Sequence, residues 1–201
     1  MRNYKALMLL FLFFILSCKN NSKNIIIEQN SDIAKVIECV IMNDSLNILR
    51  SDSMPIPLSK ELNKLKVYRL KMTNNKRPPK PEKGIYLEDL FYYRLDNKFI
   101  PEKDSLYLLN QNESVKTYVI ENTFQKKINL TTFKEQKDKR KANKSAEFVY
   151  LTFPIFSSDN AKAYLEIVNV CFGDCGSGQA VYLEKKNGKW QIVYEHQLWV
   201  G

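Results

Sequence analysis

The chain is poor in the residues that enzymes most often use for catalysis and in those that make tight turns. It contains one histidine, four cysteines and six glycines among 201 residues. It shows no Ser-His-Asp pattern, no phosphate loop ending in Lys-Ser or Lys-Thr, and no paired carboxylates assignable to the histidine. The sequence therefore favours a protein that is not an enzyme, and we expect no cofactor.

The sequence also lacks an apolar run long enough to span a bilayer as a permanent helix. The apolar segment from Ala6 to Leu16 follows the basic residues Arg2 and Lys5 and precedes Ser17-Cys18. A basic start, a short apolar stretch and a small residue before the cut predict a secretory signal peptide.

The segment Ile15-Leu16-Ser17-Cys18 resembles the lipobox of bacterial lipoproteins, with Ile in place of the usual Leu three residues before the cysteine. The resemblance implies cleavage before Cys18, lipidation of its thiol and acylation of the new amine, which together anchor a protein stably. The alternative is an ordinary signal peptide or an uncleaved segment. The phenylalanine-rich signal, Lys19 and the tail Asn-Gly-Lys-Trp…Leu-Trp-Val-Gly are similar to lipoproteins of the Bacteroidota. That likeness implies the cell envelope, at the outer membrane, and no particular activity.

The predicted segments are a signal peptide at residues 1–17, the lipidated cysteine and a tether at 18–30, and a single domain at 31–201. Removing the signal peptide lowers the net charge from +9 to +7, because it carries two basic residues and no acidic one. An exported, membrane-anchored chain rarely meets nucleic acid, so we expect a basic surface that at most attracts anionic headgroups. The expected partners are the membrane, through the lipid, and an envelope protein or glycan.

The last part of the chain predicts a four-stranded antiparallel meander. Strands are expected at residues 147–153 and 163–170, followed by a hairpin about Asn187-Gly188, a pair that tolerates the positive φ angles of a type I′ turn. This register places Val181 opposite Tyr194. Alternation puts Trp199 on one face and a mostly apolar set on the other, the predicted core face: Trp190, Ile192, Tyr194, His196, Leu198 and Val200.

A helix is predicted before the strands. Ser31 or Asp32 can cap it, and a continuous apolar stripe follows at Ile33, Val36, Ile37, Val40 and Ile41. A long N-terminal helix packed on an antiparallel meander is an α+β architecture. A curved sheet of the nuclear-transport-factor-like or cystatin-like kind fits this order, by an analogy that implies no function.

Four segments of the middle of the chain matter below. Residues 84–95 predict a strand, and residues 101–109 a short helix. The basic residues from Lys134 to Lys144 indicate a solvated helix face or a mobile loop. Arg77-Pro78-Pro79-Lys80-Pro81 indicates a stiff surface connection rather than a polyproline ligand.

The cysteines predict a disulfide and no metal site. Cys171 and Cys175 bracket a bend between two strands, and an oxidising compartment permits a bridge across it. Three intervening residues in a hairpin differ from a redox motif, which has two and opens a helix. Cys39 is then unpaired, although pairing with Cys171 or Cys175 stays open. The loop Gly173–Gly178 is expected to need unusual backbone angles.

His196 and Tyr194 are the candidate ligand-binding residues. A lone histidine on a core face is most simply a packed residue bonded to a carbonyl or carboxylate. If the sheet curls, the same face lines a cavity, where His196 could contact a ligand or act as a base. The predicted function is a binding module for a protein, glycan or small ligand. The alternatives are an envelope enzyme using His196, and an inhibitor or immunity-type lipoprotein. A binding module or an inhibitor needs an exposed apolar or aromatic patch, for which residues 91–93 and Trp199 are candidates.

Overall fold

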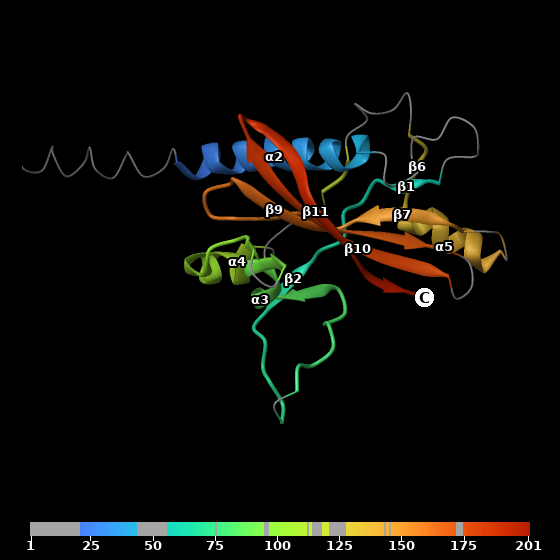
Figure 1. Cartoon of the computed structure of the whole chain (residues 1–201). Coiled ribbons are helices and arrows are strands. Elements are labelled where there is room, and N and C mark those ends of the chain that lie inside the picture. The colour runs from blue at the N-terminus through green and yellow to red at the C-terminus, as the bar shows by residue number, and fades with distance from the viewer. Residues whose placement is uncertain are drawn as a thin grey trace, which may run out of the picture. The chain divides into compact units, whose positions relative to one another are not determined.

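The computed structural model describes residues 21–43, 56–74, 76–94, 97–111, 113, 118–120, 128–142, 144, 146–171 and 175–201, with side chains from residue 31 onward. The chain divides into two compact units between Lys35 and Val36, within helix α2 (Asn21–Met42). The architecture is α+β with a mostly antiparallel sheet and few helices (Figure 1), as the sequence predicts. Cys18 and the predicted signal peptide lie outside the described residues. None of the helices within these ranges is long and apolar enough to cross a membrane.

One sheet dominates the unit from Val36 to Gly201. Within the described ranges it has seven strands in the order β11-β10-β9-β7-β1-β6, with β8 paired to β9. All neighbours are antiparallel except β1, which runs parallel to β6 and β7. The strands are β1 (Leu58–Ser59), β6 (Leu130–Thr131), β7 (Phe148–Leu151), β8 (Ile155–Phe156), β9 (Lys162–Val170), β10 (Gly176–Lys186) and β11 (Lys189–Val200).

The turn between β10 and β11 has the predicted geometry. Asn187 and Gly188 both adopt positive φ angles, 51° and 75°. Lys186 lies opposite Lys189, and Leu183 lies opposite Ile192, as the two-residue turn requires.

The predicted alternation along β11 is wrong between its two register shifts, at Tyr194 and His196. Tyr194 pairs with Tyr182 rather than with Val181, and Trp199 pairs with Gly178, because the register shifts twice in this strand. Each bulge inserts one residue and so inverts the inward and outward positions that follow it. Trp190 and Ile192 therefore share a face with Leu183, as predicted. Tyr194 and His196 lie on the opposite face, although alternation placed them with Trp190. The second shift returns Trp199 to the face opposite Trp190, which is its predicted position.

The face of the sheet that carries Leu165, Leu183 and Trp190 packs toward the part of α2 from Val36 onward. The apolar stripe of this part of the helix is buried, as predicted, at Val36, Ile37, Val40 and Ile41. The thiol of Cys39 donates to the carbonyl oxygen of Trp190 at 3.3 Å. The start of the helix differs from the prediction, because α2 begins at Asn21, ahead of Ser31 and inside the expected tether.

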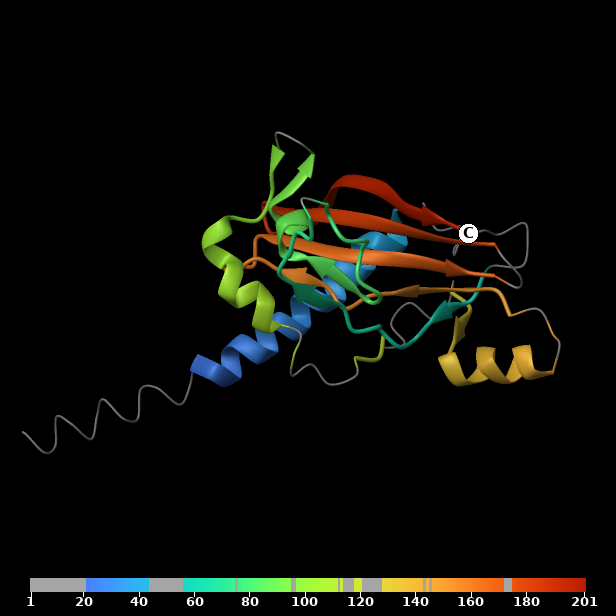
Figure 2. The ribbon, with the colours of Figure 1, turned by 90° about the horizontal axis from the view of Figure 1, so that it is seen from below.

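The opposite face, which carries Tyr164, Tyr182 and His196, is called the cleft face below. Short elements cover one end of it, in front of the strands in Figure 2, whereas the part of α2 from Val36 onward lies behind them. They are β2 (Lys66–Tyr68), β3 (Gly84–Tyr86), α3 (Leu87–Phe91), β4 (Tyr92–Arg94), β5 (Asn97–Lys98), the 3-10 turn η1 (Glu102–Asp104) and α4 (Ser105–Gln111). Leu90, Phe99 and Tyr182 belong to the core between these layers.

The strand predicted at residues 84–95 is interrupted by α3. Leu87, Leu90 and Phe91 are spaced at i, i+3 and i+4, and all three are buried, so the local apolar period is helical. Glu88 and Asp89 occupy the first turn, where acidic residues are favourable. Phe91 consequently belongs to the core and not to an exposed aromatic patch.

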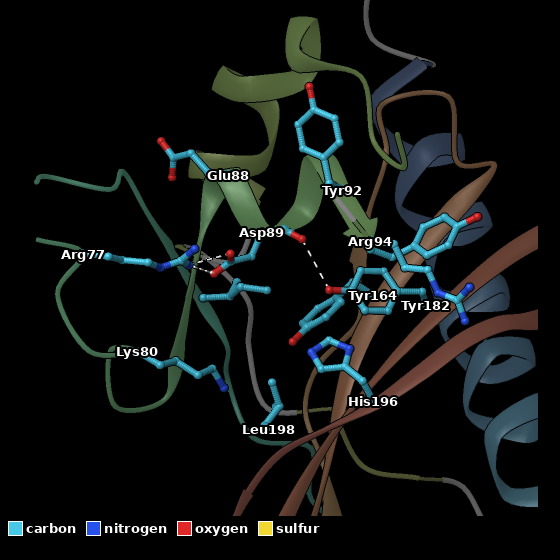
Figure 3. Close-up of a pocket in the computed structure, with 12 residues that line it drawn as sticks. Arg77, Lys80, Glu88, Asp89, Tyr92, Arg94, Tyr164, Tyr182, His196 and Leu198 are labelled. Atoms are coloured by element: carbon cyan, nitrogen blue, oxygen red, sulfur yellow. Dashed lines mark hydrogen bonds and ion pairs between the residues drawn. The ribbon is translucent and has the colours of Figure 1, made fainter. Parts of the chain in front are cut away.

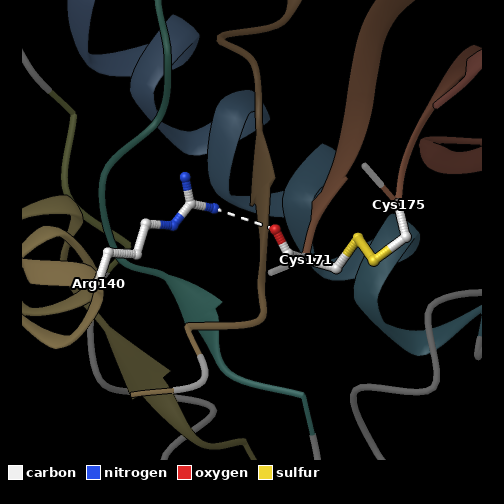
Figure 4. The surroundings of a disulfide bond; sticks show 3 residues. All are labelled: Arg140, Cys171 and Cys175. Carbon is white, nitrogen blue, oxygen red and sulfur yellow. Dashed lines mark hydrogen bonds between the residues drawn. A yellow bond between two sulfur atoms is a disulfide. The ribbon is translucent and has the colours of Figure 1, made fainter. Parts of the chain in front are cut away.

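The basic segment after Thr132 is the helix α5 (Phe133–Lys141). Thr132 and Glu135 form a capping box, in which each side chain accepts from the other's backbone amide. Arg140 of α5 donates to the carbonyl oxygen of Cys171 at 3.4 Å (Figure 4). The sulfur atoms of Cys171 and Cys175 lie at disulfide distance, 2.20 Å, between the end of β9 and the start of β10.

Candidate functional site

A cleft of about 500 Å³ opens on the cleft face beside α3. One wall comes from the sheet, and the other comes from α3 and from the proline-rich segment before β3 (Figure 3). We name it the tyrosine cleft, after the residues that line it: Arg77, Lys80, Ile85, Glu88, Asp89, Tyr92, Tyr93, Arg94, Tyr164, Tyr182, His196 and Leu198.

The wall formed by α3 and the proline-rich segment is held by an ion pair. A guanidinium nitrogen of Arg77 lies 2.5 Å from both carboxylate oxygens of Asp89, and the same guanidinium lies 5.5 Å from the ring centre of Tyr86. The hydroxyl of Tyr86 donates to the carbonyl oxygen of Pro79 at 2.9 Å. The segment that was expected to be only a surface connection is therefore fixed against β3 and α3.

Lys80 connects this wall to the sheet. Its ammonium group lies 2.7 Å from both carboxylate oxygens of Glu166, which is only 4% exposed. The hydroxyl of Tyr164 donates to the same carboxylate at 2.9 Å, and the amide of Glu166 donates to Thr152 at 2.8 Å. A buried carboxylate is tolerated when it is paired and hydrogen-bonded in this way.

The wall formed by the sheet is aromatic. The His196 ring lies nearly parallel to Tyr194 and Tyr182, with ring centres 5.4 and 5.8 Å away and interplanar angles of 28° and 27°. The guanidinium of Arg94 lies 4.9 Å from the ring centre of Tyr194, within the range of a cation–π contact. Together these side chains form a continuous aromatic surface that reaches the cleft at His196 and Tyr182.

Burial sets the protonation of this wall. It lowers the pKa of His196, so the imidazole is neutral at neutral pH, and its Nδ1 has no hydrogen-bond partner among the residues described. Burial raises the pKa of Tyr164 and of Tyr182, so both phenols keep their protons. The Tyr182 hydroxyl donates a hydrogen bond to the backbone carbonyl oxygen of Asp89, at 3.4 Å (Figure 3).

The charges of the cleft balance. Arg77, Lys80 and Arg94 supply three cations, and Glu88 and Asp89 supply two carboxylates beside the Glu166 that binds Lys80. Glu88 also accepts from the backbone amide of Leu70 at 3.1 Å. The cleft therefore combines many hydrogen-bonding groups with little net charge.

The two candidate residues of the sequence lie together, but in different positions. His196 lines the tyrosine cleft, whereas Tyr194 lies behind it, between His196 and Arg94. Both lie on the face of the sheet opposite Trp190. The prediction that they share a core face with Trp190 is therefore wrong. Cys39 has a free thiol, and burial raises its pKa. Where side chains are described, no group of three or more His, Cys, Asp or Glu residues is arranged to hold a metal.

The charged wall of the cleft escaped the sequence analysis. Lys80 and Glu166 are 86 positions apart, and no local pattern connects them. Arg77 and Asp89 are closer, but the strand predicted across Asp89 concealed the helix that aims its carboxylate at Arg77. The prolines around Lys80 were the one usable signal, because they indicated a segment of fixed shape.

Comparison of the chain with protein-family models, with curated proteins and with solved structures found no match. The chemistry of the cleft is therefore interpreted from its own residues.

Proposed function

We propose that the protein is a lipid-anchored binding domain of the cell envelope, and that the tyrosine cleft binds an uncharged sugar. The observation that carries this proposal is the contrast between its two walls. The sheet presents the partly exposed ring of His196, which stacks on the buried Tyr182. The charged groups opposite it are already paired, Arg77 with Asp89 and Lys80 with Glu166 of the sheet.

A sugar suits this contrast for two physical reasons. Its ring has an apolar face that can stack on an aromatic side chain, and its hydroxyls both donate and accept hydrogen bonds. A charged ligand at Arg77 or Lys80 would have to compete with the existing ion pairs, because burying a charge is costly unless an opposite charge is free to pair with it. The balanced cleft favours the uncharged ligand.

The alternative of an enzyme that uses His196 receives less support from the geometry. A general base is expected to have a hydrogen-bonded group that orients its ring. Nδ1 of His196 has no such partner within the described part of the chain, and Asp89 and Glu166 are engaged by Arg77 and Lys80. Of the two candidate patches through which an inhibitor could dock, residues 91–93 are less favoured because Phe91 is buried, whereas 42% of Trp199 is exposed.

Replacement of His196 by alanine should weaken sugar binding by about tenfold, because one stacking surface of the cleft is lost. The measurement is calorimetric titration of the purified protein with mono- and disaccharides of glucose and N-acetylglucosamine. Tyr107→Ala is the matched control, since Tyr107 is an exposed aromatic residue of α4 that does not line the cleft. Equal affinities in wild type and His196→Ala would argue against this cleft, and conversion of the sugar by wild type would favour the enzyme.

Replacement of Cys18 by alanine should abolish membrane anchoring, because the acyl chains that the lipobox resemblance implies can no longer be attached. Cell fractionation and mass spectrometry of the mature N-terminus report on this. The control is Cys39→Ala, which leaves the lipobox intact. A Cys18→Ala protein that matures and partitions into membranes like wild type would refute the lipid anchor.

A further inference from the structure

A second cleft, of about 330 Å³, opens on the same face of the sheet. We name it the tryptophan cleft, because Trp199 forms one side of it. Its other lining residues include Asn63, Tyr150, Thr152, Glu166 and Val168. Lys80 lines both clefts, and the carboxylate that it binds, Glu166, faces the second one.

Trp199 is seated on β10 by two glycines. A Cβ atom at Gly178 would lie 2.1 Å from Nε1 of the Trp199 indole, and one at Gly176 would lie 3.1 Å from its six-membered ring. Any larger residue at Gly178 would displace the indole. Neither glycine has a positive φ, so a left-handed backbone does not require them, and their function here is to make room for the ring. The indole thus lies along the strand, and 42% of the residue stays exposed.

The two clefts follow one another along the strands. On β9, Tyr164 lines the tyrosine cleft, whereas Glu166 and Val168 line the tryptophan cleft. On β11, His196 lines the first and Trp199 the second. At the rise of an extended strand, Tyr164 and Val168 are about 13 Å apart, which is further than one sugar ring extends.

We propose that the two clefts are successive subsites of one groove for a linear, uncharged oligosaccharide. Trp199 is the stacking platform of the far subsite, and the Lys80–Glu166 pair lies between the subsites and supplies hydrogen bonds to the sugar that crosses it. This inference rests on the proposed sugar binding in the tyrosine cleft. It adds that the ligand is a chain, and that its length determines the affinity.

The second cleft also combines an aromatic platform with polar and charged side chains, three lysines (Lys64, Lys80 and Lys83) and two glutamates (Glu82 and Glu166). Lys80 is neutralised by Glu166, and the ammonium group of Lys64 donates to the carbonyl oxygen of Glu113 at 2.5 Å. Both clefts open on the face of the sheet, whereas an extended peptide that forms a backbone ladder would bind at the edge strand β11, in the plane of the sheet. A sugar chain needs only aromatic platforms and polar side chains, and both are present.

The test is calorimetric titration with β-1,4-linked oligomers of glucose and of N-acetylglucosamine, from the disaccharide to the hexasaccharide. In the wild-type protein, affinity should rise by about tenfold over this series, because the long chain gains the Trp199 contact. Trp199→Ala should remove that gain and lower hexasaccharide affinity by about tenfold, whereas Trp199→Phe should restore part of it. His196→Ala should weaken binding of every oligomer, and circular dichroism confirms that each variant is folded.

The outcomes separate the two proposals. If wild type binds the disaccharide and the hexasaccharide equally well, the groove is refuted but the tyrosine cleft stands as a sugar site. If Trp199→Ala weakens short and long chains alike, Trp199 is not a far subsite and the inference is overturned. If wild type binds none of these sugars, both the groove and the sugar site are refuted.

Discussion

Replacement of Trp190 by alanine should lower the free energy of unfolding by about 3–5 kcal/mol, the range for deleting a buried aromatic side chain. Trp190 is only 7% exposed, and its ring centre lies 5.7 Å from that of Phe156. Its carbonyl oxygen accepts a hydrogen bond from the thiol of Cys39 in α2. Removal of the indole would therefore leave a void between the sheet and this part of α2. Guanidinium unfolding followed by circular dichroism measures the loss.

Trp199→Ala is the matched comparison for Trp190→Ala. The same large side chain is removed, but 42% of the residue is exposed and it lies on the opposite face of the sheet. We expect a loss of about 1 kcal/mol, as for a partly exposed residue whose removal leaves little cavity. If Trp199→Ala were the more damaging change, the packing of Trp190 between the sheet and α2 would not be the main source of stability at this end of the sheet.

Replacement of Lys80 by methionine should destabilise the protein by about 2–3 kcal/mol, because it leaves the Glu166 carboxylate buried with the Tyr164 hydroxyl as its main partner. This value is below the usual cost of breaking a buried pair, since Lys80 itself is partly exposed. Denaturant unfolding in the absence of ligand isolates the effect on stability from any effect on binding.

A double-mutant cycle tests the cause of this loss. Lys80→Met combined with Glu166→Gln should be more stable than Lys80→Met alone, because the buried charge is gone. Lys139→Met on the exposed surface of α5 is the control for loss of a lysine, and it should change stability by less than about 0.5 kcal/mol. Equal effects of Lys80→Met and Lys139→Met would show that the Lys80–Glu166 pair contributes nothing.

The elements that the sequence predicted well are those whose signals are local. Asn187-Gly188 determines its turn, because the positive φ angles required there are ones that these two residues tolerate. The apolar stripe from Val36 to Ile41 has the period of a helix with one buried face, and that face is buried. The α+β class follows from such elements in sequence order.

The predictions of secondary structure and of strand faces were wrong where a local pattern is compatible with two structures. The aromatic residues after Gly84 suit a strand, but Leu87, Leu90 and Phe91 have helical spacing, and packing against the sheet selects the helix. Along β11, strict alternation misplaced Tyr194 and His196, because the register with β10 shifts between Tyr182 and Leu183; the second shift, between Gly178 and Gln179, returns Trp199 to its predicted face. The position of a bulge depends on how a strand pairs with its neighbour, so the sequence of one strand alone does not reveal it.

The sequence by itself determined the hairpin turn, the buried stripe of α2 and the α+β class, because each depends on residues that are close together in the chain. The tertiary structure alone decided the clefts. Lys80 meets Glu166 across 86 positions, and Trp199 rests on Gly178 only after two shifts of register. The physical reason is that a cleft is built from contacts between elements distant in sequence, which form only when strand register and loop position are settled together.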